Sequence, residues 1–312
     1  MEVTECTIEY FGGLGNYDNC FNSPQFIKQV AANTDSVRIL LFKSSKKVKL
    51  VLVVGIDDGI GKSPFSAPFG GFIPFSNNIS MLEIDEAITL LINWTRTNGL
   101  KKLLITSPPD FYNQSFNSKI HNSLIRNAFN FTCCELNFHL RIDDFQSQQF
   151  EKEILWRNAR KNLQIALNSD LDFVKVNDDQ RAVAYDVILK NRTEKGYELK
   201  LSFAELLLTA NTTGIDFFLV NKDSVPVAAA IVYEVRSNIV QVVYWGGLSI
   251  YQEYKPINFL AYKLIAFYSD KGVDFIDIGP SSINSIPDYG LCDFKESIGC
   301  NVSNKNTYTY VK

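Results

Sequence analysis

The chain has 312 residues, of which 46% are hydrophobic and 21% charged, and its formal net charge is −3 at pH 7. This length suffices for about two domains with separate cores, and the composition is that of a globular protein. The weak negative charge argues against DNA or a membrane surface as a partner. No apolar run approaches the roughly 18 residues that a membrane span needs. The six cysteines show no CxxC spacing and the N-terminus does not resemble a signal peptide, so we expect a cytoplasmic protein with free thiols.

The first half of the chain predicts a hairpin followed by alternating helices and strands. Ser80, with Glu83 three residues later, forms a capping box that begins a helix, and Gly99 ends it. A further strand is expected to lead into the glycine pair Gly70-Gly71. In chain order, the other expected elements are strands over 37–42 and 48–56, a strand over 101–106, a helix over 119–129 and a strand over 132–142.

The second half predicts a similar order behind a basic helix over 152–166. Pro256 suits the first position of a helix. The expected elements are helices over 178–191 and 202–209, strands over 216–220, 225–233 and 239–245, a helix from 256, a strand over 273–278, a helix over 292–298 and a strand over 307–311. This order predicts two α+β domains, each a mixed, mostly antiparallel sheet flanked by helices. Because 143–151 is polar, we expect an N-terminal domain over 1–147 and a C-terminal domain over 148–312.

Several features recur in the two halves. Gly70-Gly71, between Phe69 and Phe72, has a counterpart in Gly246-Gly247, which follows Trp245; the two pairs are 176 positions apart. A distance of this size indicates a duplicated domain, since solenoid units span about 20–50 residues. We expect each pair at the end of a central strand, where the missing side chains let a ligand approach the backbone. A bend in the sheet is the alternative explanation.

The segment Gly290–Gly299, which reads GLCDFKESIG, resembles the C-terminal GL-x-x-FK-x-x-(F/I)G segment of Fem-type (FemABX-like) transferases. Phe275–Gly279 and the basic helix around 158–162 resemble further parts of that family, and the likeness covers nearly the whole chain. It implies tandem GNAT acyltransferase-like domains and transfer of an acyl or aminoacyl group to an amine. The acceptor would be a peptidoglycan precursor or a related small molecule, attacked directly without a covalent enzyme intermediate.

The resemblance also implies a donor, acyl-CoA or aminoacyl-tRNA, used as a substrate with no permanently bound cofactor. Acetyl-CoA enzymes carry a glycine-rich phosphate loop before a helix, whereas residues 248–256 contain no glycine. The long helical arm often found in Fem proteins that use aminoacyl-tRNA has no counterpart either. We expect a small-molecule or nucleotide-linked acceptor and a tRNA acceptor end as partners. A non-catalytic binding protein of the same fold is the alternative function.

Two residues are the predicted catalytic groups. Lys295 lies in the resembling segment, where a fixed cation would stabilise the oxyanion of acyl transfer; an exposed helix lysine is the alternative. Asp277 interrupts an apolar strand and would act as a base on the amine, or else bond to a structural partner, because an unpaired buried carboxylate is costly. These positions predict that the C-terminal domain carries the reaction channel and that the N-terminal domain supports it.

The predicted ligand-binding residues surround these two groups. The predicted substrate-binding residues are Trp245, Gly246, Gly247, Tyr251, Arg192, Tyr197, Ser281, Tyr289, Phe69, Gly70 and Gly71. For Trp245 the alternative is a core position. Arg157, Arg160 and Lys161 are the predicted donor phosphate-binding residues, with a solvated helix face as the alternative. The only histidines, His121 and His139, have no partner at metal-ligand spacing, so we expect no metal site.

Overall fold

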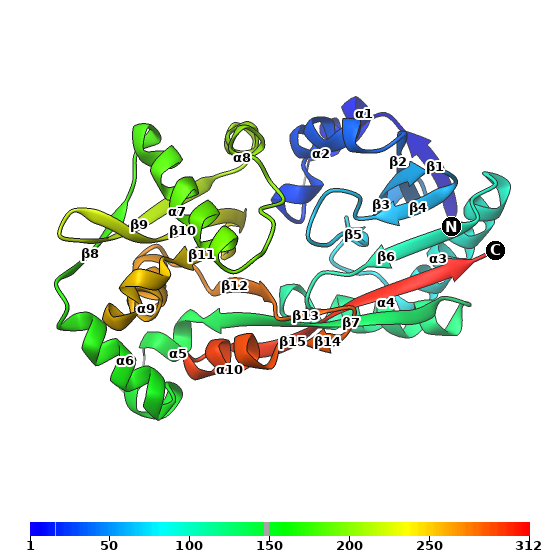
Figure 1. Ribbon diagram of the computed structural model, residues 1–312. Coiled ribbons are helices and arrows are strands. Elements are labelled where there is room, and N and C mark those ends of the chain that lie inside the picture. The colour runs from blue at the N-terminus through cyan, green and yellow to red at the C-terminus, as the bar shows by residue number, and fades with distance from the viewer. Residues whose placement is uncertain (16, 147–149) are drawn as a thin grey trace. The chain divides into compact units, whose positions relative to one another are not determined.

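The computed structural model describes residues 1–15, 17–146 and 150–312 (Figure 1). The chain divides into two compact units, called here unit 1 and unit 2. Unit 1 consists of Met1–Leu136, Ser282–Ile286 and Ser303–Lys312, and unit 2 consists of Asn137–Ser281 and Pro287–Val302. The C-terminal strand thus belongs to unit 1, although its sequence lies in the second half. The domain boundary predicted between 147 and 148 falls outside the described residues and stays a prediction.

Unit 1 contains the predicted hairpin, β2 and β3, and the predicted capping box of α3, in which Ser80 and Glu83 bond reciprocally. Its elements are β1 (Glu2–Cys6), α1 (Ile8–Leu14), η1 (Cys20–Asn22), α2 (Pro24–Val30), η2 (Ala31–Asn33), β2 (Ser36–Ser44), β3 (Lys47–Asp57), β4 (Ile60–Ser63), β5 (Phe72–Pro74), α3 (Met81–Thr97), β6 (Lys102–Thr106), η3 (Asp110–Tyr112), α4 (Gln114–Arg126), β13 (Ser282–Ile283), the first part of β7 (Asn130–Arg141) and most of β15 (Asn301–Val311).

Helices cover both faces of the unit 1 sheet, as the alternation along β2 requires. Leu40 and Phe42 belong to a core formed with α3 and α4. Ile39 and Leu41 belong to a second core, formed with Phe11 of α1 and with α2. Successive side chains of a strand point to opposite faces, so β2 is buried on both sides. Its near-continuous apolar run follows from this burial.

Unit 2 is a helix-flanked sheet in the strand order β8-β9-β10-β11-β12-β7. Neighbouring strands are antiparallel except β11 and β12, which are parallel. Its elements are α5 (Ile142–Gln146), η4 (Phe150–Ile154), α6 (Arg157–Leu167), β8 (Leu171–Lys175), η5 (Asp178–Gln180), α7 (Arg181–Glu194), α8 (Phe203–Ala210), β9 (Ile215–Lys222), β10 (Val225–Arg236), β11 (Ile239–Gly247), η6 (Ser249–Tyr254), α9 (Pro256–Asp270), β12 (Phe275–Pro280) and α10 (Tyr289–Ser297), together with the end of β7 and the start of β15.

The parallel pair at the centre of unit 2 is short. β11 and β12 pair only from Ile239 to Gln241 and from Phe275 to Asp277. β11 continues for six residues to Gly247 while β12 continues to Pro280, so the pairing between these two strands ends well before either strand does. Beyond Gln241, β11 keeps only its partner β10. This early end of pairing opens the sheet beside the last residues of β11.

The glycine pair Gly246-Gly247 is the end of β11, as predicted, and packing explains it. A Cβ on Gly246 would lie 2.3 Å from the Asn191 Oδ1 on α7, and a Cβ on Gly247 would lie 3.1 Å from Ile257 on α9. Since neighbouring residues of a strand face opposite sides, α7 and α9 cover opposite faces of the sheet. The Asn191 Nδ2 also donates to the Gly247 carbonyl, at 2.7 Å. The glycines therefore let two helices approach the strand.

The first glycine pair is not at the end of a strand, and that prediction was wrong. Gly70 and Gly71 lie in the loop between β4 and β5, seven and eight residues after β4 ends. A Cβ on Gly70 would lie 2.7 Å from the Pro64 nitrogen, and Gly71 has a positive φ of 86°. Close backbone packing and a left-handed conformation both require glycine there. The sequence likeness of the two pairs thus conceals different local structures.

Several elements differ from prediction at their ends or were not predicted. The helix α10 begins at Tyr289 rather than at 292, because the Asp288 side chain caps it by accepting from the Leu291 N–H. The basic helix α6 begins at Arg157 rather than at 152, after the single π-helical turn η4. The strand predicted before the first glycine pair is β4, whereas β1, α1, α2, β5 and β8, which are short elements without clear periodicity, were not predicted.

We expect Gly246→Ala to destabilise the protein by about 1–3 kcal/mol, because the new methyl group would overlap the Asn191 side chain. Urea unfolding measures this loss. In the double variant Gly246→Ala/Asn191→Ala the loss should be smaller than the sum of the single losses. Gly13→Ala is the control, because nothing lies within 4 Å of a Cβ there. Additive losses at 246 and 191 would contradict the proposed overlap.

Candidate functional site

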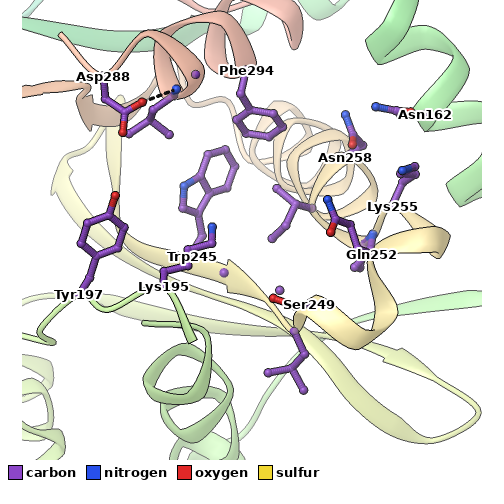
Figure 2. A pocket seen from close by; sticks show the side chains of 17 residues that line it. Asn162, Lys195, Tyr197, Trp245, Ser249, Gln252, Lys255, Asn258, Asp288 and Phe294 are labelled. Carbon is purple, nitrogen blue, oxygen red and sulfur yellow. Dashed lines mark hydrogen bonds between the residues drawn. The ribbon is translucent and has the colours of Figure 1, made fainter. Parts of the chain in front are cut away.

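A pocket of about 590 Å³ opens in unit 2 beside the end of β11 (Figure 2). Its walls come from segments that are far apart in the sequence: the end of β11, η6, the first turn of α9, the α7–α8 loop, α10 and one residue of α6. The volume lies in the range of small-molecule sites, roughly 300–1,000 Å³. The opening beyond the β11–β12 pairs leaves room for it.

Two aromatic rings form the apolar part of the pocket. Trp245 of β11 and Phe294 of α10 lie with ring centroids 6.0 Å apart, and both line the pocket. Figure 2 shows the two rings as neighbours near the middle of the pocket, tilted relative to one another. Trp245 is therefore not a core tryptophan. The sequence did not predict Phe294 as a pocket residue, because its position indicates only an anchor of its own helix.

The rim of the pocket is polar and carries charges of both signs. Lys195, Lys255 and Asp288 line it, together with the side chains of Gln252 and Asn258. Lys255 has a left-handed backbone conformation, with φ 54°, and precedes Pro256, the predicted first residue of α9. Asp288 is exposed and combines its cap of α10 with a place at the rim. The sequence did not predict Gln252, Lys255, Asn258 or Asp288 at a site, because residues 252–258 and 288 lie in separate segments that only folding brings together.

Lys295 is buried, with 2% of its surface exposed. Its ammonium group donates to three carbonyl oxygens: Ile278 at 3.2 Å, Gly279 at 2.9 Å and Pro280 at 3.1 Å. These carbonyls lie beyond the last β11–β12 pair. The alternative of an exposed helix lysine is wrong. An ammonium group has three N–H donors, so the three carbonyls use its whole donor capacity in this conformation.

Burial lowers the pKa of Lys295 to about 8, while the nearby Cys300 thiol and Asp277 carboxylate oppose this shift. The ammonium also lies 5.2 Å from the centre of the Phe138 ring, a favourable cation–π distance. A lysine held in this way organises the backbone of residues 278–280. The geometry favours a positioning role over direct contact with an oxyanion.

Asp277 is the last residue of β12 that pairs with β11, and it is fully buried. Its carboxylate accepts from the Asn137 Nδ2 at 2.8 Å, the Gln241 Nε2 at 2.9 Å and the Gly279 N–H at 2.8 Å. A buried carboxylate is stable only when bonded in this way. Asp277 thus joins three strands and fixes the irregular register after it. The geometry favours its structural alternative over a base that reaches substrate.

The other predicted substrate-binding residues of unit 2 divide into those that line the pocket and those that do not. Tyr197, Gly246 and Gly247 line it, and Arg192 stacks its guanidinium over the Tyr197 ring at 5.9 Å. The remaining three, Tyr251, Ser281 and Tyr289, are not among the lining residues. Ser281 is buried, and its carbonyl accepts from the Asp288 N–H at 2.8 Å. It therefore holds the segment that leads into α10.

The predicted phosphate-binding residues lie on α6, and its residue Asn162 lines the pocket. Arg157 and Lys161 are exposed and border a shallow groove with Trp156. Arg160 instead donates to the Lys152 carbonyl at 3.0 Å. Two of the three cations are thus available to a ligand.

The remaining predicted residues, Phe69, Gly70 and Gly71, belong to unit 1 and border a cavity of about 30 Å³. That volume holds little more than one water molecule. Phe69 is buried against the Phe21 and Tyr112 rings. These contacts are those of a core residue.

No group of three or more His, Cys, Asp or Glu side chains that could hold a metal ion occurs within 1–15, 17–146 and 150–312. Burial lowers the pKa of both His121 and His139 to about 4. In the same described ranges, no helix has the length and apolar character of a membrane span.

We expect Lys295→Met to lower the free energy of unfolding by about 2 kcal/mol or more, because three carbonyls lose a buried donor. Urea denaturation measures the change. The exposed Lys161→Met is the matched control, with an expected change within about 0.5 kcal/mol. Equal losses in the two variants would contradict the carbonyl contacts.

We expect stability to depend on His139 between pH 6.5 and 4. The pKa of this imidazole falls from 6.5 in the unfolded chain to about 4 in the folded protein. The unfolded chain therefore binds more protons across this range, and the free energy of unfolding falls as the pH is lowered, by up to about 3 kcal/mol from this group. His139→Gln should lose less stability over the same range, measured by urea unfolding at each pH. Parallel curves would be inconsistent with a buried neutral imidazole.

Comparisons with known proteins bear on the fold. A scan against protein-family models and a search of curated proteins both give no match. Among solved structures, FemX has a TM-score of 0.73 at 11% identity, and the match covers 100% of this chain and 98% of that one. L-PGS from Bacillus licheniformis has a TM-score of 0.58 at 10% identity over 97% and 90% of the two chains.

A third structure is the C-terminal domain of an Agrobacterium fabrum protein assigned as a lysylphosphatidylglycerol synthetase. It has a TM-score of 0.60 at 9% identity over 93% of this chain and 87% of that one. All three matches extend over nearly the whole chain, as the segment Gly290–Gly299 led us to expect. The chain therefore shares the α+β fold of FemX over its whole length.

Proposed function

We propose that this protein transfers an acyl or aminoacyl group from an activated ester or thioester to an amine acceptor, in the unit 2 pocket. The observation that supports this most directly is the pocket beside the end of β11, where this strand no longer pairs with β12, with its aromatic pair Trp245 and Phe294 and its charged rim. The fold is shared with FemX and L-PGS, and the name of the Agrobacterium fabrum relative describes attachment of a lysyl group.

The reaction proposed is direct attack. The neutral amine forms the new C–N bond, the C–O or C–S bond of the donor breaks, and the amine proton leaves with the alcohol or thiol. Such a reaction depends mainly on holding the two reactants in line. Trp245 and Phe294 would hold the apolar part of a substrate, and Asp288 would bind the amine. Among the residues that line the pocket, Asp288 is the one carboxylate.

Lys295 and Asp277 support the reaction indirectly in this proposal. Their hydrogen bonds hold residues 278–280, and the Ser281 carbonyl then holds Asp288 at the start of α10. Both would therefore act as positioning residues for the rim. A direct role of Lys295 at the oxyanion would require its ammonium to leave at least one of the three carbonyls.

The acceptor we propose is a primary amine on a cell-wall precursor or a related small molecule. The exposed cations Arg157 and Lys161 of α6 would hold phosphates of a donor or acceptor, since Asn162 of the same helix lines the pocket. Arginine and lysine at such a surface bind phosphates by charge and hydrogen bonds. A tRNA acceptor end and a nucleotide-linked acceptor would both satisfy this surface.

A binding protein without catalysis is the second candidate. This candidate is favoured because the two predicted catalytic groups, Lys295 and Asp277, already form hydrogen bonds within the protein. The two functions differ in one measurement, the appearance of an N-acylated amine in the presence of donor and acceptor.

We expect Trp245→Ala and Phe294→Ala each to weaken substrate binding by about tenfold or more, which is roughly 1.4 kcal/mol. The protein is first screened with aminoacyl-tRNA, acyl-CoA and UDP-linked precursors by thermal shift, because a ligand of the folded state raises the melting temperature. Product formation with the hits is then followed by mass spectrometry. Tyr10→Ala, an exposed aromatic residue of unit 1, is the control.

Ligand binding without any N-acylated product would contradict the proposed transferase activity and would support the non-catalytic binding protein. With an active enzyme, Lys295→Arg separates the two roles of Lys295. If Lys295 only positions the rim, the variant should have both a lower melting temperature and a lower activity, and the loss of activity should be the same at every pH. A catalytic cation predicts a lower kcat with stability unchanged.

A further inference from the structure

A carboxylate of α7, that of Glu194, bonds to the turn that follows β11 at one end of the pocket. Ser249, the first residue of η6, lines the pocket, and both its N–H and its hydroxyl donate to the Glu194 Oε2, at 3.1 and 2.7 Å. These two hydrogen bonds lower the pKa of Glu194, and Lys195 lowers it further. The carboxylate is therefore ionised at neutral pH. A negative charge of the protein itself occupies the donors of Ser249.

Two further backbone donors of this turn also have partners within the protein. The Leu248 N–H donates to the Val227 carbonyl at 2.9 Å, and the Tyr251 N–H donates to the Leu248 carbonyl at 3.1 Å. To bind the donors of Leu248, Ser249 or Tyr251, an incoming anion would have to break one of these bonds or displace Glu194. Backbone N–H groups at such a turn are what a phosphate otherwise binds.

Glu194 is held in place by the helix that carries it. Asn191, three residues earlier and so on the same side of α7, donates to the Gly247 carbonyl at 2.7 Å. The close approach of Asn191 to Gly246 fixes the distance between α7 and the end of β11. The last turn of α7 is therefore attached to the strand and to η6 by side chains only three positions apart.

We propose that Glu194 is a specificity residue that keeps pyrophosphate-bearing donors, such as acyl-CoA, out of this end of the pocket. The inference rests on the proposed acyl transfer and narrows its donor to molecules that present an uncharged or cationic group here. A diphosphate brings negative charge to the same hydrogen-bond donors, and like charges at short distance repel. The rim cations Lys195 and Lys255 would attract the same anion once the carboxylate charge is removed.

Binding of coenzyme A, followed by isothermal titration calorimetry, tests the proposal on the full chain. Glu194→Gln keeps an oxygen that can accept from Ser249 and removes only the charge. Glu194→Ala removes both. We expect wild type to bind coenzyme A weakly or not at all, and both variants to bind at least about tenfold more tightly. The gain should shrink at high ionic strength, and inorganic pyrophosphate should compete for the site.

Glu205→Gln is the matched control. The Glu205 carboxylate accepts the same two hydrogen bonds, from the Ser202 N–H at 2.8 Å and from the Ser202 hydroxyl at 2.6 Å. Glu205 is not among the pocket-lining residues. It should leave coenzyme A binding unchanged. Tight binding by wild type, or equal weak binding by wild type and both Glu194 variants, would overturn the proposal. Failure of wild type to transfer any acyl group would contradict the proposed function instead, because the calorimetry measures binding alone.

Discussion

The structure of unit 2 depends on how the sheet is held open between β11 and β12. Two parallel strands that stop pairing leave main-chain carbonyl groups without their usual partners, and buried carbonyls need donors. Lys295 supplies three such donors to residues 278–280, and Asp277 accepts from a side chain on each neighbouring strand at the point of separation. The opening is therefore a stable part of the fold, and the pocket lies beside it.

This arrangement changes the interpretation of the segment Gly290–Gly299. Its lysine is directed inward to the sheet, while its phenylalanine, Phe294, faces the pocket beside Trp245. The same short helix thus stabilises the strands with one residue and lines the ligand space with another. Asp288, which caps the helix, adds a charge at the rim. A single segment couples the stability of the opening to the shape of the pocket.

The two glycines at the end of β11 show how closely α7 packs against this strand. Gly246 admits Asn191, which bonds to Gly247, and Glu194 on the same helix bonds to Ser249. The missing side chains at the end of β11 are explained by this helix, and no ligand is needed to account for them. The same packing brings Glu194 to the N–H and hydroxyl of Ser249, so these two donors are already bonded within the protein.

The sequence alone determined the elements that depend on local patterns. The hairpin of β2 and β3, the capping boxes at Ser80 and Ser202, and the proline start of α9 are all set by residues within a few positions of each other. The segment around Lys295 also indicated the fold. The pocket could not be predicted in full, because Lys195, Lys255 and the α10 segment with Asp288 and Phe294 are brought together from three separate parts of the chain. Only the tertiary structure decided that Lys295 bonds to carbonyls and that Glu194 faces Ser249, because both contacts depend on burial and on how helices pack against a sheet.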